Sequence, residues 1–103
     1  MPLSDDGAAL RLKDDDDVAV ALRPLACGGI VRFAATASER NAFTVAIASE
    51  IPTGHKFATR SIEGGALIRK YGQVIGRATG PIAAGEHVHV HNVEGTRGRG
   101  DLA

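Results

Sequence analysis

One phrase recurs along the chain and constrains its fold more than any other feature of the sequence. Its copies are 21-ALRPLACGGIV-31, 58-ATRSIEGGALI-68 and 78-ATGPIAAGEHV-88, with a shorter echo in 51-IPTGHKF-57. Each copy has an apolar residue three positions before a glycine and another apolar residue three positions after it. Such a glycine is typical of a tight turn, because glycine adopts backbone angles that other residues resist. The phrase therefore predicts related hairpins that fold back on one another.

The segments between these turns have the alternation of strands. Val18, Val20 and Leu22 would share one face of a strand, and 66-ALIRKYGQVIGRA-78 reads as two short strands joined at Tyr71-Gly72. The segment 43-FTVAIA-48 contains β-branched residues that favour a strand, and 86-EHVHVHNV-93 alternates strictly. Helical periodicity over twelve or more residues is absent from the sequence. We therefore expect a mostly β, compact domain of short strands and hairpins.

The size and charge of the chain limit the classes of function that it could have. A length of 103 residues fits one domain, and twelve basic residues balance twelve acidic ones. With this balance and only four aromatic residues, we expect no nucleic-acid partner and no membrane partner. A single cysteine, Cys27, excludes an internal disulfide and fits a cytoplasmic location. The small core and the exposed edges of short strands favour a protein partner or a homo-oligomer.

The two ends of the sequence differ from its middle. Residues 1–16 are acidic and turn-rich, and the Asp run at 14–17 lacks the glycine and final Glu of an EF-hand calcium loop. We expect residues 1–16 to be a flexible, solvated lead-in. Residues 94–103 are rich in Gly and Arg and lack apolar anchors, which predicts a flexible tail. The folded domain is therefore expected over residues 17–93.

Three of the four histidines alternate along one expected strand. His87, His89 and His91 would share one face, since every second side chain of a strand points the same way. Two imidazoles at this spacing are close enough to bind one metal ion, and imidazole suits zinc, iron, copper or nickel. The same pattern also describes the polar side of a half-buried strand. Spacing alone leaves both interpretations open.

The fourth histidine follows the glycine of a predicted turn. His55 and Lys56 come directly after Gly54, where a carboxylate or phosphate of a substrate could contact both side chains. The alternative is an ordinary surface hairpin with a solvated lysine. Lys70 and Tyr71 lie at another expected hairpin tip and carry the same two interpretations.

The order of these motifs resembles a known family. The stretch 51-IPTGHKFATRSIEGGALIRKYGQVIGRATGPIAAGEHVHVHN-92 is similar to the amino-terminal module of the altronate dehydratase family, a β-clip domain of the SAF superfamily. The resemblance extends over residues 17–93 and rests on the motifs Ile-Pro-x-Gly-His-Lys, Lys-Tyr-Gly-x-x-Ile-Gly and Gly-Glu-His-Val-His-x-His-Asn. The chain also resembles the separate small alpha subunit of sulfolactate sulfo-lyase.

The resemblance implies part of a lyase. Altronate dehydratase removes water from a sugar acid to give a 2-keto-3-deoxy acid and depends on iron(II), and a large catalytic subunit or domain accompanies the SAF module. We therefore expect a small subunit of such a dehydratase with a sugar-acid substrate. The alternatives are the alpha subunit of a sulfolactate sulfo-lyase and a stand-alone module that binds a carboxylate or carbohydrate.

The same resemblance assigns roles to residues. It implies His55 and Lys56 as catalytic residues and His55, His87, His89 and His91 as metal ligands. It also implies Lys70, Tyr71 and Asn92 as substrate-binding residues. Galactarate dehydratase, a more distant relative, is similar at the Gly-His-Lys turn but not at the histidine strand. That difference favours the turn as the shared chemical element, with the histidine strand as the second candidate for metal or for docking against the large subunit.

Overall fold

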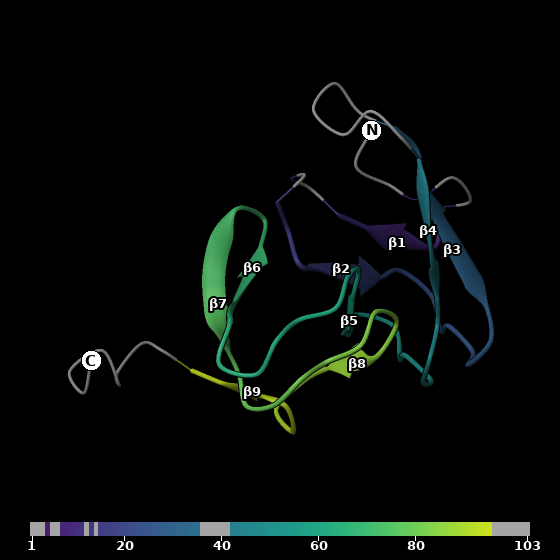
Figure 1. Cartoon of the computed structure of the whole chain (residues 1–103). Coiled ribbons are helices and arrows are strands. Elements are labelled where there is room, and N and C mark those ends of the chain that lie inside the picture. The colour runs from purple at the N-terminus through teal and green to yellow at the C-terminus, as the bar shows by residue number, and fades with distance from the viewer. Residues whose placement is uncertain (1–3, 5–6, 12, 14, 36–41, 96–103) are drawn as a thin grey trace.

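The computed structural model describes residues 4, 7–11, 13, 15–35 and 42–95, and all regular structure in these residues is β (Figure 1). The strands are β1 (Ala9–Leu10), β2 (Val18–Ala21), β3 (Ile30–Phe33), β4 (Phe43–Ala46), β5 (Lys56–Ala58), β6 (Leu67–Lys70), β7 (Gln73–Ala78), β8 (His87–Val88) and β9 (Val93–Glu94). The described part of the chain contains no helix that could span a membrane. The expected mostly β domain of short strands is confirmed.

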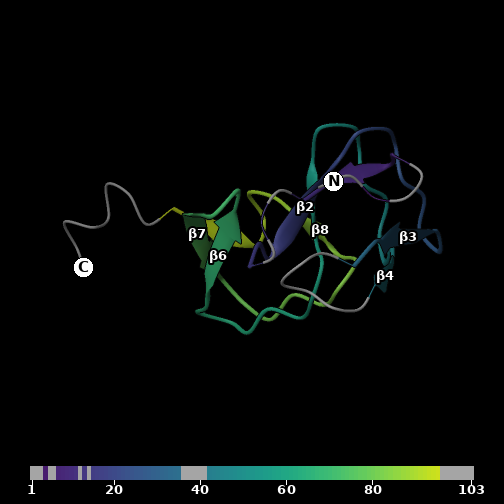
Figure 2. The same ribbon diagram turned by 90° about the horizontal axis from the view of Figure 1, so that it is seen from above.

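The strands form three small antiparallel sheets. The central sheet has the order β1-β2-β5-β8, and the others are the pair β3-β4 and the sheet β6-β7-β9. In both views, β6 and β7 lie on one side of the central sheet and β3 and β4 lie on the opposite side (Figures 1 and 2). The central sheet therefore joins the two ends of the molecule.

The repeated phrase forms the same turn each time. Its glycines are Gly28, Gly54, Gly65 and Gly85, with φ angles of 93°, 84°, 85° and 87°. The apolar residues three positions before them pair across the molecule, Leu25 with Ile51 and Ile62 with Ile82. Each pair exchanges two backbone hydrogen bonds of 2.8–2.9 Å. The predicted family of related turns is confirmed, and the turns interlock in pairs.

One of these turns carries His55 and is fastened to the central sheet. The N–H of Gly54 donates to the carbonyl of Ala21 at 2.7 Å, and the N–H of Ala21 donates to the carbonyl of His55 at 2.9 Å. Because Ala21 ends β2, the backbone of the turn is held where β5 begins. The position of His55 is thus fixed by main-chain hydrogen bonds.

The core has two parts that meet at the central sheet. One cluster of buried residues includes Phe33, Val45 and Phe57, and the other includes Ala58, Ile68 and Val88. Phe57 and Ala58 are neighbours in β5, and successive side chains of a strand point to opposite faces. Strand β5 therefore contributes to both clusters, which accounts for the burial of both side chains.

The lead-in differs from the expectation of a flexible segment over residues 1–16. Ala9 and Leu10 form β1, which pairs with β2, and the side chains of Ala8, Ala9 and Asp16 are buried. The prediction is wrong for these residues. Ala8 and Ala9 pack beside β2, and the Asp16 carboxylate accepts hydrogen bonds from the N–H groups of Lys13 and Gly72. Residues 1–3, 5–6, 12 and 14 lie outside the described residues, as do residues 96–103 of the expected tail.

Candidate functional site

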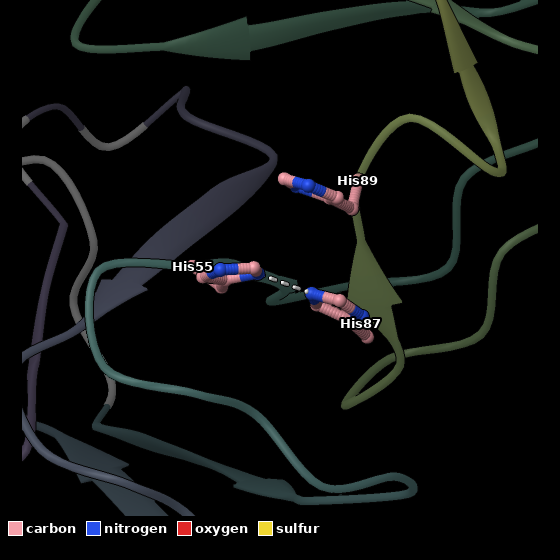
Figure 3. Close-up of side chains that lie close together, drawn as sticks. All are labelled: His55, His87 and His89. Atoms are coloured by element: carbon pink, nitrogen blue, oxygen red, sulfur yellow. Dashed lines mark hydrogen bonds between the residues drawn. The ribbon is translucent and has the colours of Figure 1, made fainter.

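Three of the histidines converge in space. His55 lies in the turn before β5, His87 lies in β8, and His89 lies just beyond it (Figure 3). The Nδ1 atom of His55 lies 2.9 Å from the Nε2 atom of His87. The ring of His89 stacks on that of His55 with 4.5 Å between ring centroids and on that of His87 with 5.3 Å. The three rings form one half-buried cluster.

The pairing of β5 with β8 explains the convergence. Phe57 is directly opposite His87 in this antiparallel pair, and opposite residues project to the same face. Two positions before Phe57 is His55, and two positions after His87 is His89, so both return to that face. The Gly-His-Lys turn and the histidine strand are therefore one site, where sequence reasoning ranks them as a first and a second candidate.

The histidine strand is shorter than its alternation predicts. Strand β8 ends at Val88, and the Asn92 N–H donates to the His89 carbonyl at 3.1 Å to close a turn. The Asn92 side chain holds this turn, because its Oδ1 accepts from the His89 N–H at 2.9 Å and its Nδ2 donates to the His87 carbonyl at 2.8 Å. The expected strand over 86–93 is thus wrong beyond Val88. Val90 consequently points to solvent with 82% of its surface exposed.

The turn separates His91 from the other histidines. His91 is exposed and its ring centroid lies 5.4 Å from that of His87. Its ligand atoms are not part of the group formed by His55, His87 and His89. Of the histidines implied as metal ligands by resemblance, the structure brings three together and leaves His91 at the rim.

The cluster has donor atoms that fit a metal ion. One ring nitrogen from each of the three histidines lies within 4.8 Å of the others. Metal–nitrogen bonds of about 2.0–2.1 Å in a tetrahedral site place nitrogens about 3.3–3.4 Å apart, so small side-chain rotations would bring these atoms to bonding distance. The group contains no carboxylate among the described residues. Three imidazoles would leave coordination positions for oxygen atoms of a substrate.

The charges around the cluster favour neutral imidazoles. Partial burial, followed by the neighbouring His55, lowers the pKa of His87, and the same two causes lower the pKa of His89. The nearby ammonium group of Lys56 contributes to both shifts. Since only a neutral imidazole has a nitrogen lone pair for a metal, these surroundings favour the metal-binding form.

Lys56 lies close to the histidines and to a second lysine, Lys70. Burial and the positive charge of Lys70 lower the pKa of Lys56, which begins β5 immediately after His55. Lys70 ends β6, and its Nζ lies 5.0 Å from the centroid of the Tyr71 ring. Lys56 therefore lies within electrostatic reach of both the histidines and Lys70, and Tyr71 lies beside Lys70. Both polar groups of the Asn92 side chain, by contrast, bind the backbone.

Other residues that support the site were missed by sequence reasoning. The Ser49 Oγ accepts a hydrogen bond of 3.0 Å from the His87 N–H, and nothing in the local pattern around Ser49 indicates this. Asp16 and Asp17 bind the hairpin that carries Lys70. Their position directly before a strand indicates that they could bind the sheet, but the run of aspartates favours a solvated segment.

Fold and site define a small all-β domain with interlocked glycine turns and a polar site at one strand pair. Residues 7–96 match the sequence model of the altronate/galactarate dehydratase SAF domain, and the chain belongs to this family. The resemblance found in the sequence is therefore confirmed.

Individual relatives are enzymes or enzyme subunits. The chain is 46% identical over 77 residues to altronate dehydratase of Escherichia coli and 36% identical over 87 residues to altronate dehydratase of Bacillus subtilis. These matches cover 75% and 82% of this chain but only 14% and 16% of the two relatives. A 60-residue match to the alpha subunit of (2R)-sulfolactate sulfo-lyase of Paracoccus pantotrophus is 35% identical and covers 58% of this chain and 90% of that subunit.

Proposed function

We propose that this chain is the small SAF subunit of a sugar-acid dehydratase, which acts with a separate large catalytic subunit. The pair would eliminate water from an aldonate such as altronate to give a 2-keto-3-deoxy acid. The observation that carries the proposal is the convergence of His55, His87 and His89 beside Lys56, in a domain that belongs to the dehydratase family. The relatives named altronate dehydratase support the choice of substrate.

The elimination needs two kinds of group. A base removes the proton from the carbon next to the carboxylate, and an acid assists the departure of hydroxide from the following carbon. The resulting enol becomes the keto acid when its carbon gains a proton. Iron(II) held by His55, His87 and His89 would supply Lewis acidity toward a substrate oxygen.

The remaining groups of the site act on the substrate directly. The ammonium groups of Lys56 and Lys70 are matched to the carboxylate of an aldonate. Lys56 also has a lowered pKa, which makes its Nζ a better proton carrier near neutral pH than an ordinary lysine. With His55 as a metal ligand, Lys56 is left as the residue that moves a proton in this chain.

The proposal is tested by reconstitution. The chain is co-expressed with the product of its neighbouring gene, and elimination is measured under anaerobic conditions with iron(II) and altronate, galactarate or sulfolactate. We expect 2-keto-3-deoxy acid from an aldonate only when both proteins are present. A complex that forms but eliminates nothing would contradict the proposal, and measurable binding of sugar acids to the chain alone would then favour a stand-alone binding module.

A second function has its own supporting observation. The chain covers 90% of the alpha subunit of (2R)-sulfolactate sulfo-lyase, which is a separate small subunit. An elimination on sulfolactate would use the same groups with sulfite instead of hydroxide as the leaving group. Release of sulfite from sulfolactate by the reconstituted pair, without water loss from the aldonates, would establish this function in place of the first.

A further inference from the structure

Two consecutive carboxylates hold the β6–β7 hairpin on both sides of its tip. Before the tip, the Asp17 Oδ2 accepts a hydrogen bond of 2.8 Å from the Arg69 N–H, and the Asp17 N–H donates to the Arg69 carbonyl at 2.9 Å. After the tip, the Asp16 Oδ1 accepts a hydrogen bond of 2.8 Å from the Gly72 N–H. Lys70 and Tyr71 are the two residues enclosed by these contacts.

The carboxylate of Asp16 is withdrawn from water. Asp16 has 0% of its surface exposed, and its second oxygen, Oδ2, accepts from the Lys13 N–H at 3.1 Å. Both oxygens therefore bind backbone N–H groups. A buried carboxylate is costly unless it is hydrogen-bonded, so its partners are held firmly in place. The side chain of Lys13 also lies over Gly72, 3.4 Å from the position of an added Cβ.

The tip that is held has an unusual backbone. Tyr71 has a φ angle of 56°, a left-handed backbone conformation that residues other than glycine rarely adopt. The pairing of β6 with β7 also shifts register between Ile68 and Arg69. Such conformations persist when surrounding contacts hold them, and they occur often at functional sites. The two carboxylates supply those contacts here.

The same two residues connect the tip to the strands of the candidate site. Asp17 leads into β2, which pairs with β5, the strand that begins with Lys56. The Thr59 N–H, just beyond β5, donates to the Asp17 carbonyl at 2.9 Å. Arg60 adds an ion pair to Asp17 of 3.1 Å and a hydrogen bond to the Asp16 carbonyl of 2.9 Å. The hairpin tip and the residues just beyond β5 are therefore both hydrogen-bonded to residues 16–17.

We propose that Asp16 and Asp17 are positioning residues that fix the backbone on both sides of Lys70 and join it to the residues just beyond β5, so that the ammonium groups of Lys70 and Lys56 together bind the carboxylate of the substrate. The inference rests on the proposed function, since it concerns a sugar acid bound at that site. Neither aspartate touches the substrate in this arrangement. Their effect is exerted through the backbone of residues 69–72. Figure 1 shows the tip of the β6–β7 hairpin beside the segment that precedes β2.

The test compares KM and kcat in the reconstituted complex. Asp16→Ala is expected to raise KM for the aldonate about 10-fold, the equivalent of losing about 1.4 kcal/mol of binding, with kcat changed less than about 2-fold. Asp15→Ala is the matched control, because Asp15 is the exposed neighbour, and it should leave both constants unchanged. Asp16→Asn, which keeps the side-chain volume but can accept only one of the two hydrogen bonds, should give a smaller rise in KM.

A double substitution separates positioning from general stability. In the Lys70→Met background, Asp16→Ala should add almost nothing to KM, because the lysine that it positions is already gone. A KM increase that is fully additive would overturn the inference, and so would an unchanged KM in folded Asp16→Ala or Asp16→Asn. If Asp16→Ala does not fold, the same comparison with and without Lys70→Met is made with Asp16→Asn. Failure of the wild-type complex to eliminate water would instead count against the proposed function.

Discussion

The Nδ1 atom of His55 and the Nε2 atom of His87 lie 2.9 Å apart, although the two residues are 32 positions apart in the sequence. One of these nitrogens must be an unprotonated acceptor, so the two rings cannot both be positively charged in this arrangement. The contact joins the turn before β5 to β8 and so connects two motifs that the sequence presents separately.

The first prediction concerns metal binding. His55→Ala or His87→Ala should weaken binding of Zn²⁺, used as an air-stable probe, by at least about 100-fold, since each change removes a direct ligand and even indirect partners of metal sites contribute 10–100-fold. His91→Ala is the control and should change affinity less than about 3-fold, because His91 lies outside the three-histidine group. Isothermal titration calorimetry at neutral pH measures both. Equal affinity in wild type and His55→Ala would rule out the cluster as a metal site.

The second prediction concerns stability in mild acid. Because the folded state lowers the pKa of His87 and His89 below the ordinary value of 6.5, the unfolded chain binds protons more readily than the folded one. The free energy of unfolding should therefore fall as the pH drops below 6.5, and these groups should add no pH dependence well above it. Urea denaturation of the metal-free chain at about pH 7.5 and about pH 5.5 measures the difference.

A substitution isolates the contribution of the histidines from that of the carboxylates. His87→Gln should reduce the loss of stability between these two pH values, since the group that resists protonation is removed. His91→Gln should reduce the loss less, because the charge of His91 is only a lesser cause of the lowered pKa of His87 and His89. A loss of stability that is the same in His87→Gln and wild type would contradict the assignment.

The third prediction concerns the repeated turn. Gly85 has a φ angle of 87°, and an added Cβ would clash with the carbonyl oxygen of Ala46. Gly85→Ala should therefore destabilise the domain by about 3 kcal/mol or more, through both backbone strain and a clash with main-chain atoms. Gly80→Ala is the matched control, because its φ is not in the left-handed region and nothing lies within 4 Å of the added Cβ. If Gly85→Ala and Gly80→Ala had the same midpoint of urea unfolding, the turn would tolerate a side chain and the prediction would be wrong.

The fourth prediction concerns Asn92. Asn92→Ala removes the hydrogen bonds to the His89 N–H and the His87 carbonyl, so it should destabilise the domain by about 1–2 kcal/mol. It should also weaken Zn²⁺ binding, because the turn that carries His89 is loosened. Asn92→Asp keeps the acceptor for the His89 N–H and should retain more of both properties. An effect on KM alone, with unchanged stability and metal affinity, would instead support the substrate-binding role implied by resemblance.

Much of the fold could be predicted because it is encoded locally. The glycine phrase recurs with fixed spacing, and each copy forms a turn whose glycine has a positive φ angle. The hairpin at Tyr71-Gly72 likewise follows from two short apolar runs around a turn. Alternation alone was less reliable, because the strand at His87 ends when Asn92 offers the backbone other hydrogen bonds.

The site could be predicted residue by residue but not as one arrangement. His55, Lys56, His87 and His89 were all recognised from their motifs, yet their meeting depends on the register of β5 with β8, which the sequence does not specify. Asp16 was misinterpreted for a related reason. Its burial depends on the long-range partner Gly72, and a run of four aspartates is otherwise typical of a solvated segment.

The most direct test of the central claim is turnover by the reconstituted complex with and without His55. Water elimination from the preferred aldonate is followed anaerobically with iron(II) for wild type, His55→Ala and the control His91→Ala. We predict that His55→Ala reduces kcat/KM by at least about 1,000-fold, equivalent to about 4 kcal/mol of transition-state stabilisation, while His91→Ala stays within about 3-fold of wild type. Full turnover and unchanged metal affinity in His55→Ala would show that the turn is structural and that the chemistry lies elsewhere.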